Sequence, residues 1–292
     1  MSIFRALFFS GFLFFSGQVF SGSDSSIFNV TLQQAKHGDA RAQWMLGIMY
    51  TQGLGVTQDY TEAVKWYRKS ADQGNSQGQW ILGVMYQKGQ GVAQDYAQAF
   101  KWYRLAAKKG IAESQAKLGT LYAQGLGVPQ DFKEAAKWYR LAAAQGLSYA
   151  QNNLGLIYHN GQGVAQDYKE AVKWYRLAAN QGDAESQTKL GTMYSQGLGV
   201  TQDYEKAFNW YQKAAMQGNV QGQFVLGNMY AHNQGAKQDF VRAYMWSSLA
   251  AIGGYAEAEK NLAVYVVQMT PEQIEKAKSM IMDCQAKDFK DC

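Results

Sequence analysis

The sequence predicts an all-α solenoid of antiparallel helix pairs with a period of 36 residues. A Leu-Gly pair and a Trp-Tyr pair each recur at this interval without an insertion. Repeats of this length are typical of solenoids or propellers, and the local period decides between them. Within one repeat the apolar and small residues follow helical spacing, so each repeat is predicted to contain two helices, A and B. The pairs are Leu46-Gly47, Leu82-Gly83, Leu118-Gly119, Leu154-Gly155, Leu190-Gly191 and Leu226-Gly227 in helix A, and Trp66-Tyr67, Trp102-Tyr103, Trp138-Tyr139, Trp174-Tyr175 and Trp210-Tyr211 in helix B, where Trp246-Ser247 is an altered sixth copy.

Residues 1–21 have the features of a secretory signal peptide. Arg5 is their only charged residue, and it precedes an apolar run that ends at Phe15. This run is shorter than the roughly 20 residues that a helix needs to cross a bilayer, so we expect cleavage rather than stable membrane insertion. A retained N-terminal membrane helix is the alternative.

Six repeats follow the leader and occupy residues 39–254. Helix A is predicted to end at a glycine, such as Gly53, in the left-handed conformation. Helix B is predicted to begin at an aspartate N-cap, such as Asp59, and four repeats place Glu or Gln three residues later, as a capping box requires. The repeats are 39–74, 75–110, 111–146, 147–182, 183–218 and 219–254, and the capping-box residues are Glu62, Gln98, Glu134 and Glu170.

Gly47 and its five equivalents lie inside helix A, where each glycine costs roughly 1 kcal/mol relative to alanine. A cost repeated in every unit implies a close backbone contact that leaves no room for a side chain. We expect the contact to be with helix B of the same repeat, through Ala63 or the Trp66-Tyr67 pair.

The first repeat contains a characteristic set of motifs: Ala42-Gln43, Leu46-Gly47, Tyr50, Gly53-x-Gly55-Val56, Gln58-Asp59-Tyr60, Ala63, Lys65-Trp66-Tyr67 and Ala71-x-Gln73-Gly74. This set resembles the Sel1-like repeat, a relative of the tetratricopeptide repeat, and the resemblance covers residues 39–254. It weakens in the sixth repeat, where Asn233-Gln-Gly235-Ala236 replaces the Gly-x-Gly-Val loop. The resemblance implies a right-handed solenoid that mediates protein interactions, with helix A on its concave surface. It also implies a bacterial protein that is periplasmic or secreted.

Both ends of the array are predicted to be caps, because a bare terminal repeat would expose its packing surface. Residues 22–38 form an N-terminal capping segment that aligns with a helix B. Residues 255–292 form a degenerate seventh repeat and a last helix, which begins at the capping box Thr270-Pro271-Glu272-Gln273. The only cysteines, Cys284 and Cys292, are expected to form a disulfide in an oxidising compartment, with two reduced thiols in a frayed tail as the alternative.

Composition and charge exclude several classes of site. Lys and Arg number 28 against 23 Asp and Glu, and the net charge of +5 is too small and too evenly spread to indicate nucleic-acid binding. The three histidines, His37, His159 and His232, fall in different repeats at unrelated positions. We therefore expect no metal site and no cofactor.

Two Ser-x-x-Lys segments are the strongest catalytic candidates, because this motif carries the nucleophile of β-lactamases and penicillin-binding enzymes. They are Ser114-Gln-Ala-Lys117 and Ser186-Gln-Thr-Lys189. Both serines align with small residues that are expected to face the partner helix, and the companion Ser-Asp-Asn and Lys-Thr-Gly motifs are absent. We therefore expect no catalytic residues and no enzymatic activity.

Helix B also carries a column of basic residues that could form an anion-binding stripe. Glu62 and its equivalents lie three residues before the lysines, so the column is interpreted as an exposed face with local ion pairs. The column consists of Lys65 and Arg68, Lys101 and Arg104, Lys137 and Arg140, and Lys173 and Arg176.

One face of helix A varies between repeats, and a partner is expected to bind there. The third and fifth repeats are polar on this face, whereas the first two are apolar and carry two tryptophans that the packing of the repeat does not require. Aromatic side chains are frequent interface hot spots. An N-terminal cap folded over this face, through Phe28, Val30 and Leu32, is the alternative. The predicted binding patch consists of Trp44, Met45, Ile48, Trp80, Ile81 and Val84.

These observations predict an exported, non-catalytic and monomeric scaffold that binds a protein or peptide on its A helices. No nucleic acid and no stable membrane insertion are expected. The alternatives are a cell-envelope hydrolase of the β-lactamase or penicillin-binding kind, and a secreted host-interaction or virulence adaptor.

Overall fold

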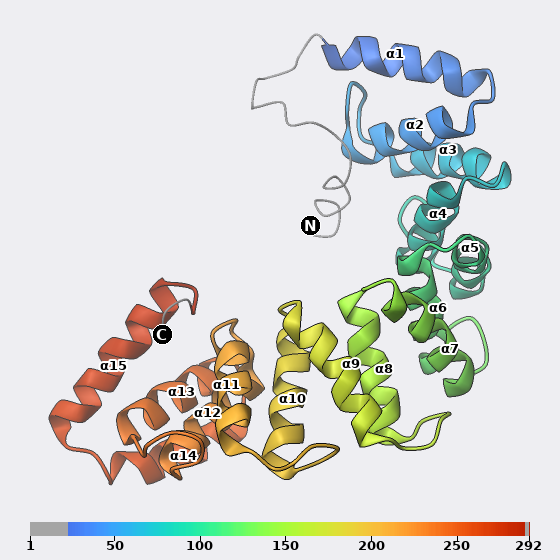
Figure 1. Ribbon diagram of the computed structural model, residues 1–292. Coiled ribbons are helices and arrows are strands. Elements are labelled where there is room, and N and C mark those ends of the chain that lie inside the picture. The colour runs from blue at the N-terminus through green and yellow to red at the C-terminus, as the bar shows by residue number, and fades with distance from the viewer. Residues whose placement is uncertain (1–22, 290–291) are drawn as a thin grey trace. The chain divides into compact units, whose positions relative to one another are not determined.

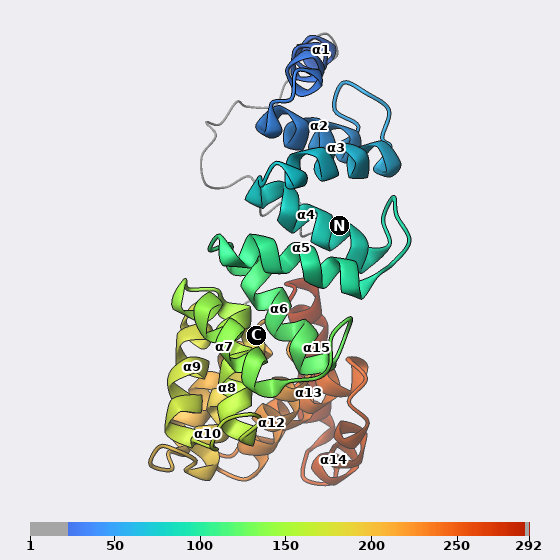
Figure 2. The same ribbon diagram turned by 90° about the vertical axis from the view of Figure 1, so that its right-hand side faces the viewer.

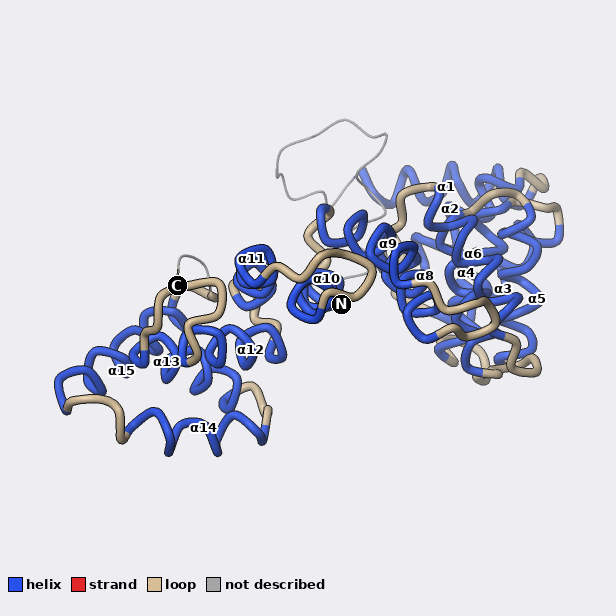
Figure 3. The backbone as a smooth tube through the Cα atoms, turned by 60° about the horizontal axis from the view of Figure 1, so that its bottom comes forward, coloured by secondary structure: helices blue, strands red, loops and turns tan. Residues whose placement is uncertain are grey.

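The computed structural model describes residues 23–289 and Cys292, which form fifteen α-helices and no β-strand (Figure 1, Figure 3). The predicted signal peptide lies outside these residues. None of the helices has the length and apolar content that crossing a bilayer requires. The chain divides into two compact units, Met1–Gln94 and Asp95–Cys292. The first contains α1 (Ser23–Lys36), α2 (Ala40–Gln52), α3 (Tyr60–Asp72) and α4 (Ser76–Lys88). The second contains α5 (Tyr96–Lys108), α6 (Ala112–Gln124), α7 (Phe132–Ala144), α8 (Ser148–Asn160), α9 (Tyr168–Asn180), α10 (Ala184–Gln196), α11 (Tyr204–Ala215), α12 (Val220–Ala231), α13 (Phe240–Ile252), α14 (Ala256–Val266) and α15 (Pro271–Ala286).

Sequence neighbours pack against one another in both units. In the first unit, α1, α2, α3 and α4 form three consecutive contacts. In the second unit, every helix from α5 to α14 contacts the next along the chain, and Figure 2 shows α7 to α10 stacked in this way. The even-numbered helices from α2 to α14 take the A position, and the odd-numbered helices from α3 to α13 take the B position. The predicted all-α array of helix pairs is confirmed.

The helix ends follow the predicted signals. The first five A helices each end at a glycine with positive φ, which at Gly53 is 73°. Each of the six B helices begins at an aspartate whose side chain accepts backbone N–H groups of the first turn. Asp59, for example, accepts the N–H of Glu62 at 3.0 Å. These bonds satisfy donors that would otherwise lack a partner at the helix start.

The glutamates do not form the second hydrogen bond of the predicted capping box, in which the N-cap backbone N–H donates to the glutamate side chain. The carboxylate of Glu62 bonds instead to the Lys65 ammonium, 2.5 Å away in the next turn. Glu134 and Glu170 make the same ion pair with the lysines three residues later. The backbone N–H that a capping box would use, that of Asp59, donates instead to the Tyr50 carbonyl oxygen at 2.9 Å, so it is not available to the glutamate. The prediction of a glutamate capping box was therefore wrong.

The glycines inside the A helices make the expected close contact, and the partner is the tyrosine of helix B. A Cβ added to Gly155 would lie 2.7 Å from ring atoms of Tyr175. At Gly47 the corresponding distance to the Tyr67 ring is 2.5 Å. The tyrosine ring therefore fills the space that a side chain on helix A would need.

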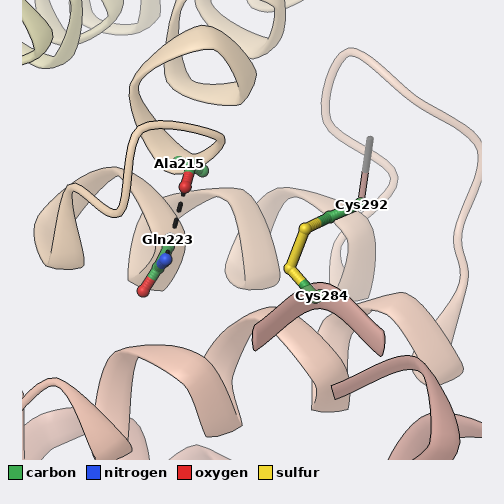
Figure 4. The surroundings of a disulfide bond; sticks show 4 residues. All are labelled: Ala215, Gln223, Cys284 and Cys292. Atoms are coloured by element: carbon green, nitrogen blue, oxygen red, sulfur yellow. Dashed lines mark hydrogen bonds between the residues drawn. A yellow bond between two sulfur atoms is a disulfide. The ribbon is translucent and has the colours of Figure 1, made fainter. Parts of the chain in front are cut away.

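A buried glutamine ties each A helix to the helix before it. Gln223 Nε2 donates to the carbonyl oxygen of Ala215 at 3.3 Å (Figure 4). A second glutamine at the end of helix B reaches a buried one within its own repeat, as Gln217 Nε2 does with Gln187 Oε1 at 2.8 Å. Removing one partner would leave a buried polar group unsatisfied, which costs about 1 to 3 kcal/mol. The equivalent glutamine–carbonyl pairs are Gln43–Ala35, Gln79–Ala71, Gln115–Ala107, Gln151–Ala143 and Gln187–Ala179.

The C-terminal helix closes the second unit by packing on α13. It begins at the predicted capping box, in which the side chains and backbone N–H groups of Thr270 and Gln273 bond reciprocally. Cys284 is 2% exposed, and its sulfur lies at bonding distance from that of Cys292 (Figure 4). The two Cα atoms are 5.1 Å apart, within the range of protein disulfides.

Candidate binding surface

The solvent-facing side of the A helices is narrower than the sequence predicts. In the second unit, the residues equivalent to Trp44 in the third to fifth repeats are Ala116, Asn152 and Thr188, which are at most 6% exposed, and the sixth repeat has the half-buried Phe224. Thr188 Oγ1 lies 3.0 Å from Oδ1 of Asn219, at the start of the next A helix. This position therefore lies between successive A helices. The accessible stripe, here called the A-face, consists in the first repeat of Arg41, Met45, Ile48 and Gln52, and elsewhere of their equivalents.

The two tryptophans of the predicted patch occupy this inward position. Trp44 in α2 and Trp80 in α4 are half-buried, and the Nε1 atom of each is shielded from solvent. Neither indole N–H has a hydrogen-bond partner among the described residues. Because an indole is larger than the side chains at this position in the second unit, part of each ring remains at the surface. The tryptophans therefore contribute to packing as well as to the A-face.

The other four residues of the patch divide into surface and core. Met45 is 40% exposed, and Ile48 and Val84 are half-buried. Ile81 is 4% exposed and belongs to the core. The structure thus brings five of the six predicted residues at least partly to the surface. The equivalent positions of the third to fifth repeats carry Lys117, Asn153 and Lys189 beside Thr120, Leu156 and Thr192. Among the first five repeats the apolar character is therefore confined largely to the first two, and the sixth repeat has the half-buried Phe224 and Val225.

The N-terminal helix packs on a different side of α2. The Phe28 ring meets Tyr50 edge-on with centroids 5.7 Å apart, and Leu32 joins the same core cluster. Val30 is 60% exposed. Trp44 is not part of this cluster. The contacts of α1 therefore leave Met45 and Ile48 accessible.

The basic column of helix B is engaged within the protein. Lys173 lies 3.3 Å from Glu170, and both side chains are largely exposed. Arg176 donates to the Tyr194 hydroxyl of the following A helix at 2.9 Å. Exposed ion pairs of this kind contribute about 0 to 1 kcal/mol. Three of the four arginines thus link successive repeats, and three of the four lysines form the expected local pairs. In the second repeat, Lys101 and Arg104 lie instead over the rings of Trp102 and Phe100.

The two Ser-x-x-Lys serines are inaccessible. Ser114 and Ser186 are each 0% exposed, and neither hydroxyl has a hydrogen-bond partner among the described residues. The lysine of the first motif, Lys117, lies over the Tyr149 ring at 5.8 Å. Lys189 pairs with Glu185 at 3.1 Å. A nucleophile must meet its base and its substrate, and the geometry at both serines prevents this.

Two of the three histidines bond to a carbonyl oxygen of their own helix or of the helix just before them. His37 Nδ1 is 2.7 Å from the Gln33 carbonyl, and His232 Nδ1 is 2.8 Å from the Asn228 carbonyl. Burial, with a smaller contribution from Lys189, lowers the pKa of His159. In the part of the chain that the structure describes, no three His, Cys, Asp or Glu side chains are grouped to hold a metal ion.

Two further apolar surfaces lie at the ends of the array, and the sequence analysis missed them. On α1, Ile27 is 52% exposed and Val30 is 60% exposed. On α14, Val264 is 59% exposed, and Val267, just beyond the helix, is 75% exposed. A comparison of each terminal helix with the repeat template would have identified them, because the template buries several of the equivalent positions.

The array of helix pairs, the interior glycines and the buried glutamines recur in six units. The sequence pattern of the Sel1 repeat matches residues 40–75, 76–111, 112–147, 148–183, 184–219 and 220–255. The chain belongs to the Sel1 repeat family. The predicted family is therefore confirmed.

Two solved structures are similar to this Sel1 repeat protein. One is c5321, described as a protective antigen present in uropathogenic Escherichia coli strains and displaying an SLR fold, with 38% identity and a TM-score of 0.79. The match covers 90% of this chain but 57% of c5321, so the chain spans little more than half of that protein. The other is a Sel1 repeat protein from Oxalobacter formigenes, with 33% identity and a TM-score of 0.66, covering 78% of this chain and 96% of that one. No curated protein sequence matches the chain.

Proposed function

We propose that this Sel1 repeat protein is an exported, non-catalytic scaffold that binds a protein or peptide on the A-face of its first two repeats. The observation that carries the proposal is the apolar character of this face. Met45, Ile48 and Val84 are at least partly accessible there, next to the surface portions of Trp44 and Trp80. Apolar patches with aromatic components and polar surroundings are common at protein interfaces.

The surroundings of the patch favour a peptide or protein over a small molecule. Arg41, Gln52 and Gln77 are exposed on the same helices and would form a polar rim. The apolar residues lie on two A helices, α2 and α4, that occupy equivalent positions in successive repeats. An extended or helical segment with apolar side chains at regular spacing fits such a surface.

A non-catalytic role is supported by the burial of the strongest nucleophile candidates. A substrate carbonyl cannot reach Ser114 or Ser186 without separating the helices around them, since both serines are 0% exposed. The envelope-hydrolase alternative is therefore disfavoured. A turnover assay with a chromogenic β-lactam tests it, and measurable hydrolysis by the purified protein would revive it.

Export is proposed from the leader-like residues 1–21 together with the C-terminal cysteines. A disulfide between Cys284 and Cys292 is compatible with an oxidising compartment. The likeness to c5321, a protective antigen, favours a second candidate within the same class, a host-facing adaptor. Detection of the protein in culture medium or on intact cells, rather than only in a periplasmic extract, would distinguish the second candidate from the first.

Site-specific photo-cross-linking in living cells tests the proposed surface. A photoreactive amino acid is placed at Met45 or at Val84, and the matched control carries it at Leu177, which is 43% exposed on α9. We expect the first two positions to yield the same discrete protein adduct and the control to lack it. Identical adducts from all three positions, or none from Met45 and Val84, would remove the proposal.

A further inference from the structure

The helix α1 has the position of a helix B, and no helix A precedes it among the residues that the structure describes. Phe28 packs edge-on against Tyr50 with centroids 5.7 Å apart. Phe100 of α5 and Tyr122 of α6 form the same pair two repeats later, at 5.3 Å. The Ala35 carbonyl accepts a hydrogen bond from α2, as the ends of other B helices do from the A helix that follows them. Figure 1 shows α1 at the edge of the first unit, beside α2.

The side of α1 that would face a helix A is open. In α3, the residues on this side are at most 9% exposed, because α2 covers them. In α1, the residues 36 positions earlier include isoleucine and valine side chains that are 52% and 60% exposed. The covered residues of α3 are Ala63, Trp66 and Ser70. Their equivalents in α1 are Ile27, Val30 and Gln34, and these three residues are here called the α1 edge.

The helix α14 presents the opposite case, a helix A without its helix B. The leucine before the interior glycine is 0% exposed in all six repeats, but its equivalent Leu262 is partly exposed. Ala263, which replaces the glycine, is exposed. Leu262 and Ala263 are here called the α14 edge. Figure 3 shows α14 at the border of the second unit.

The last helix does not supply the missing helix B. In the repeat register, the tryptophan position of a seventh helix B would be Met282, which is 63% exposed. The buried residues of α15 are Ala277 and Cys284, which fall outside that register, and the helix packs on α13. The α14 edge therefore remains without a partner in the second unit.

We propose that a second copy of this chain completes the repeat: α1 of one molecule packs on α14 of another as helix B of a seventh unit. The contact would continue, between molecules, the A–B interface that already holds each repeat together. Because the two edges differ, the association is heterologous and head-to-tail, so that each added copy presents a further free edge. This inference replaces the monomer that the sequence alone led us to expect.

Polar residues at the ends of the two helices can form a pair across the contact. Inside the array, Gln73 Nε2 donates to Gln43 Oε1 at 2.7 Å, from the end of helix B to the start of its own helix A. The equivalents in the proposed contact are His37, after α1, and Glu259, in α14. Both are exposed. A neutral hydrogen bond of the repeat would become a charge-assisted one between the two molecules.

Sedimentation velocity of the purified protein over a concentration series tests the association. A single helix pair buries less than a standard interface, so we expect a dissociation constant on the order of 10 to 1,000 μM. The mean mass should rise with concentration. A mass that stays at that of one chain up to about 1 mM overturns the proposal.

Complementation between two blocked variants tests the head-to-tail geometry. Val30→Glu blocks the α1 edge and Ala263→Glu blocks the α14 edge, both at exposed sites that tolerate a charge. Each variant alone should remain monomeric, and their equimolar mixture should form a dimer, because one intact edge of each kind remains. Leu177→Glu, a matched change at a position 43% exposed, should associate like the parent protein. Self-association of either blocked variant, or no dimer in the mixture, contradicts the head-to-tail contact.

A charge exchange provides an independent test that does not alter the apolar edges. Glu259→Lys should weaken self-association at least tenfold, which corresponds to about 1.4 kcal/mol. Adding His37→Glu to the same chain should restore it, since the pair is then reversed rather than lost. Equal association by the parent and Glu259→Lys, or no recovery in the double variant, counts against the proposed register.

Discussion

Replacing Gly155 by alanine should destabilise the protein, although alanine is the better helix former. In an exposed helix the substitution would stabilise by roughly 1 kcal/mol. Here the new methyl group would lie 2.7 Å from two ring carbons of Tyr175, which is 1% exposed and has no free space to move into. Overpacking of a rigid core costs about 1 to 3 kcal/mol. The clash offsets the gain in helix propensity, so we expect a net loss of up to about 2 kcal/mol.

Urea unfolding followed by far-UV circular dichroism measures the net effect. Repeat arrays can unfold in more than one step, so hydrogen exchange of the α8 and α9 amides should accompany it. The matched double variant adds Tyr175→Ala, which removes the ring that the new methyl group would meet. The cost of Gly155→Ala should shrink by at least 0.5 kcal/mol in that background. If Gly155→Ala stabilises the protein, or if its cost is the same in both backgrounds, the argument for the interior glycines is refuted.

Three further predictions concern the leader, the thiols and the tryptophans. N-terminal sequencing of exported material should give a start within residues 21–24, and a retained first methionine would contradict export by cleavage. Peptide mapping without reductant should recover Cys284 linked to Cys292 by a bond that adds about 1 to 3 kcal/mol of stability, whereas quantitative alkylation of both thiols would exclude the bond. Trp44→Ala with Trp80→Ala should lower the stability of the first unit by about 1 to 3 kcal/mol per residue, less than for fully buried tryptophans, because both are half-buried. Unchanged hydrogen exchange in α2 and α4 would show that the rings do not pack between helices.

Much of the fold was predictable because the strict 36-residue period repeats the same local signals, and so the same helix pair, in every unit. Helix ends followed from Gly53, Asp59 and their copies, and the clash-prone glycines followed from the cost of glycine inside a helix. The role of Glu62 was not predictable in the same way. A capping box and an ion pair with Lys65 compete for one carboxylate, and the choice depends on which donor it reaches.

The candidate site was predictable only in part. A helical wheel placed Trp44 on the outer arc, but it treats a helix as isolated and cannot show that the next A helix covers this position. Ile81 was predicted at the surface but lies in the core for the same reason, since burial depends on neighbouring helices that a helical wheel does not include. The end surfaces were missed because they are defined by absent partners: Ile27 and Leu262 differ from their repeat equivalents in exposure, not in polarity.

The most direct test of the proposed binding function is the affinity of the cross-linked partner, once identified, for surface variants of the A-face. Met45→Lys with Val84→Lys changes two accessible side chains, and Leu177→Lys is the matched control. Lysine at the patch would bury an unpaired charge in the complex, so we expect affinity to fall at least tenfold, or about 1.4 kcal/mol. The Tm should stay within about 4 °C of that of the parent protein. Unchanged affinity in the double variant, or an equal loss in the control, would contradict the assignment of the binding surface.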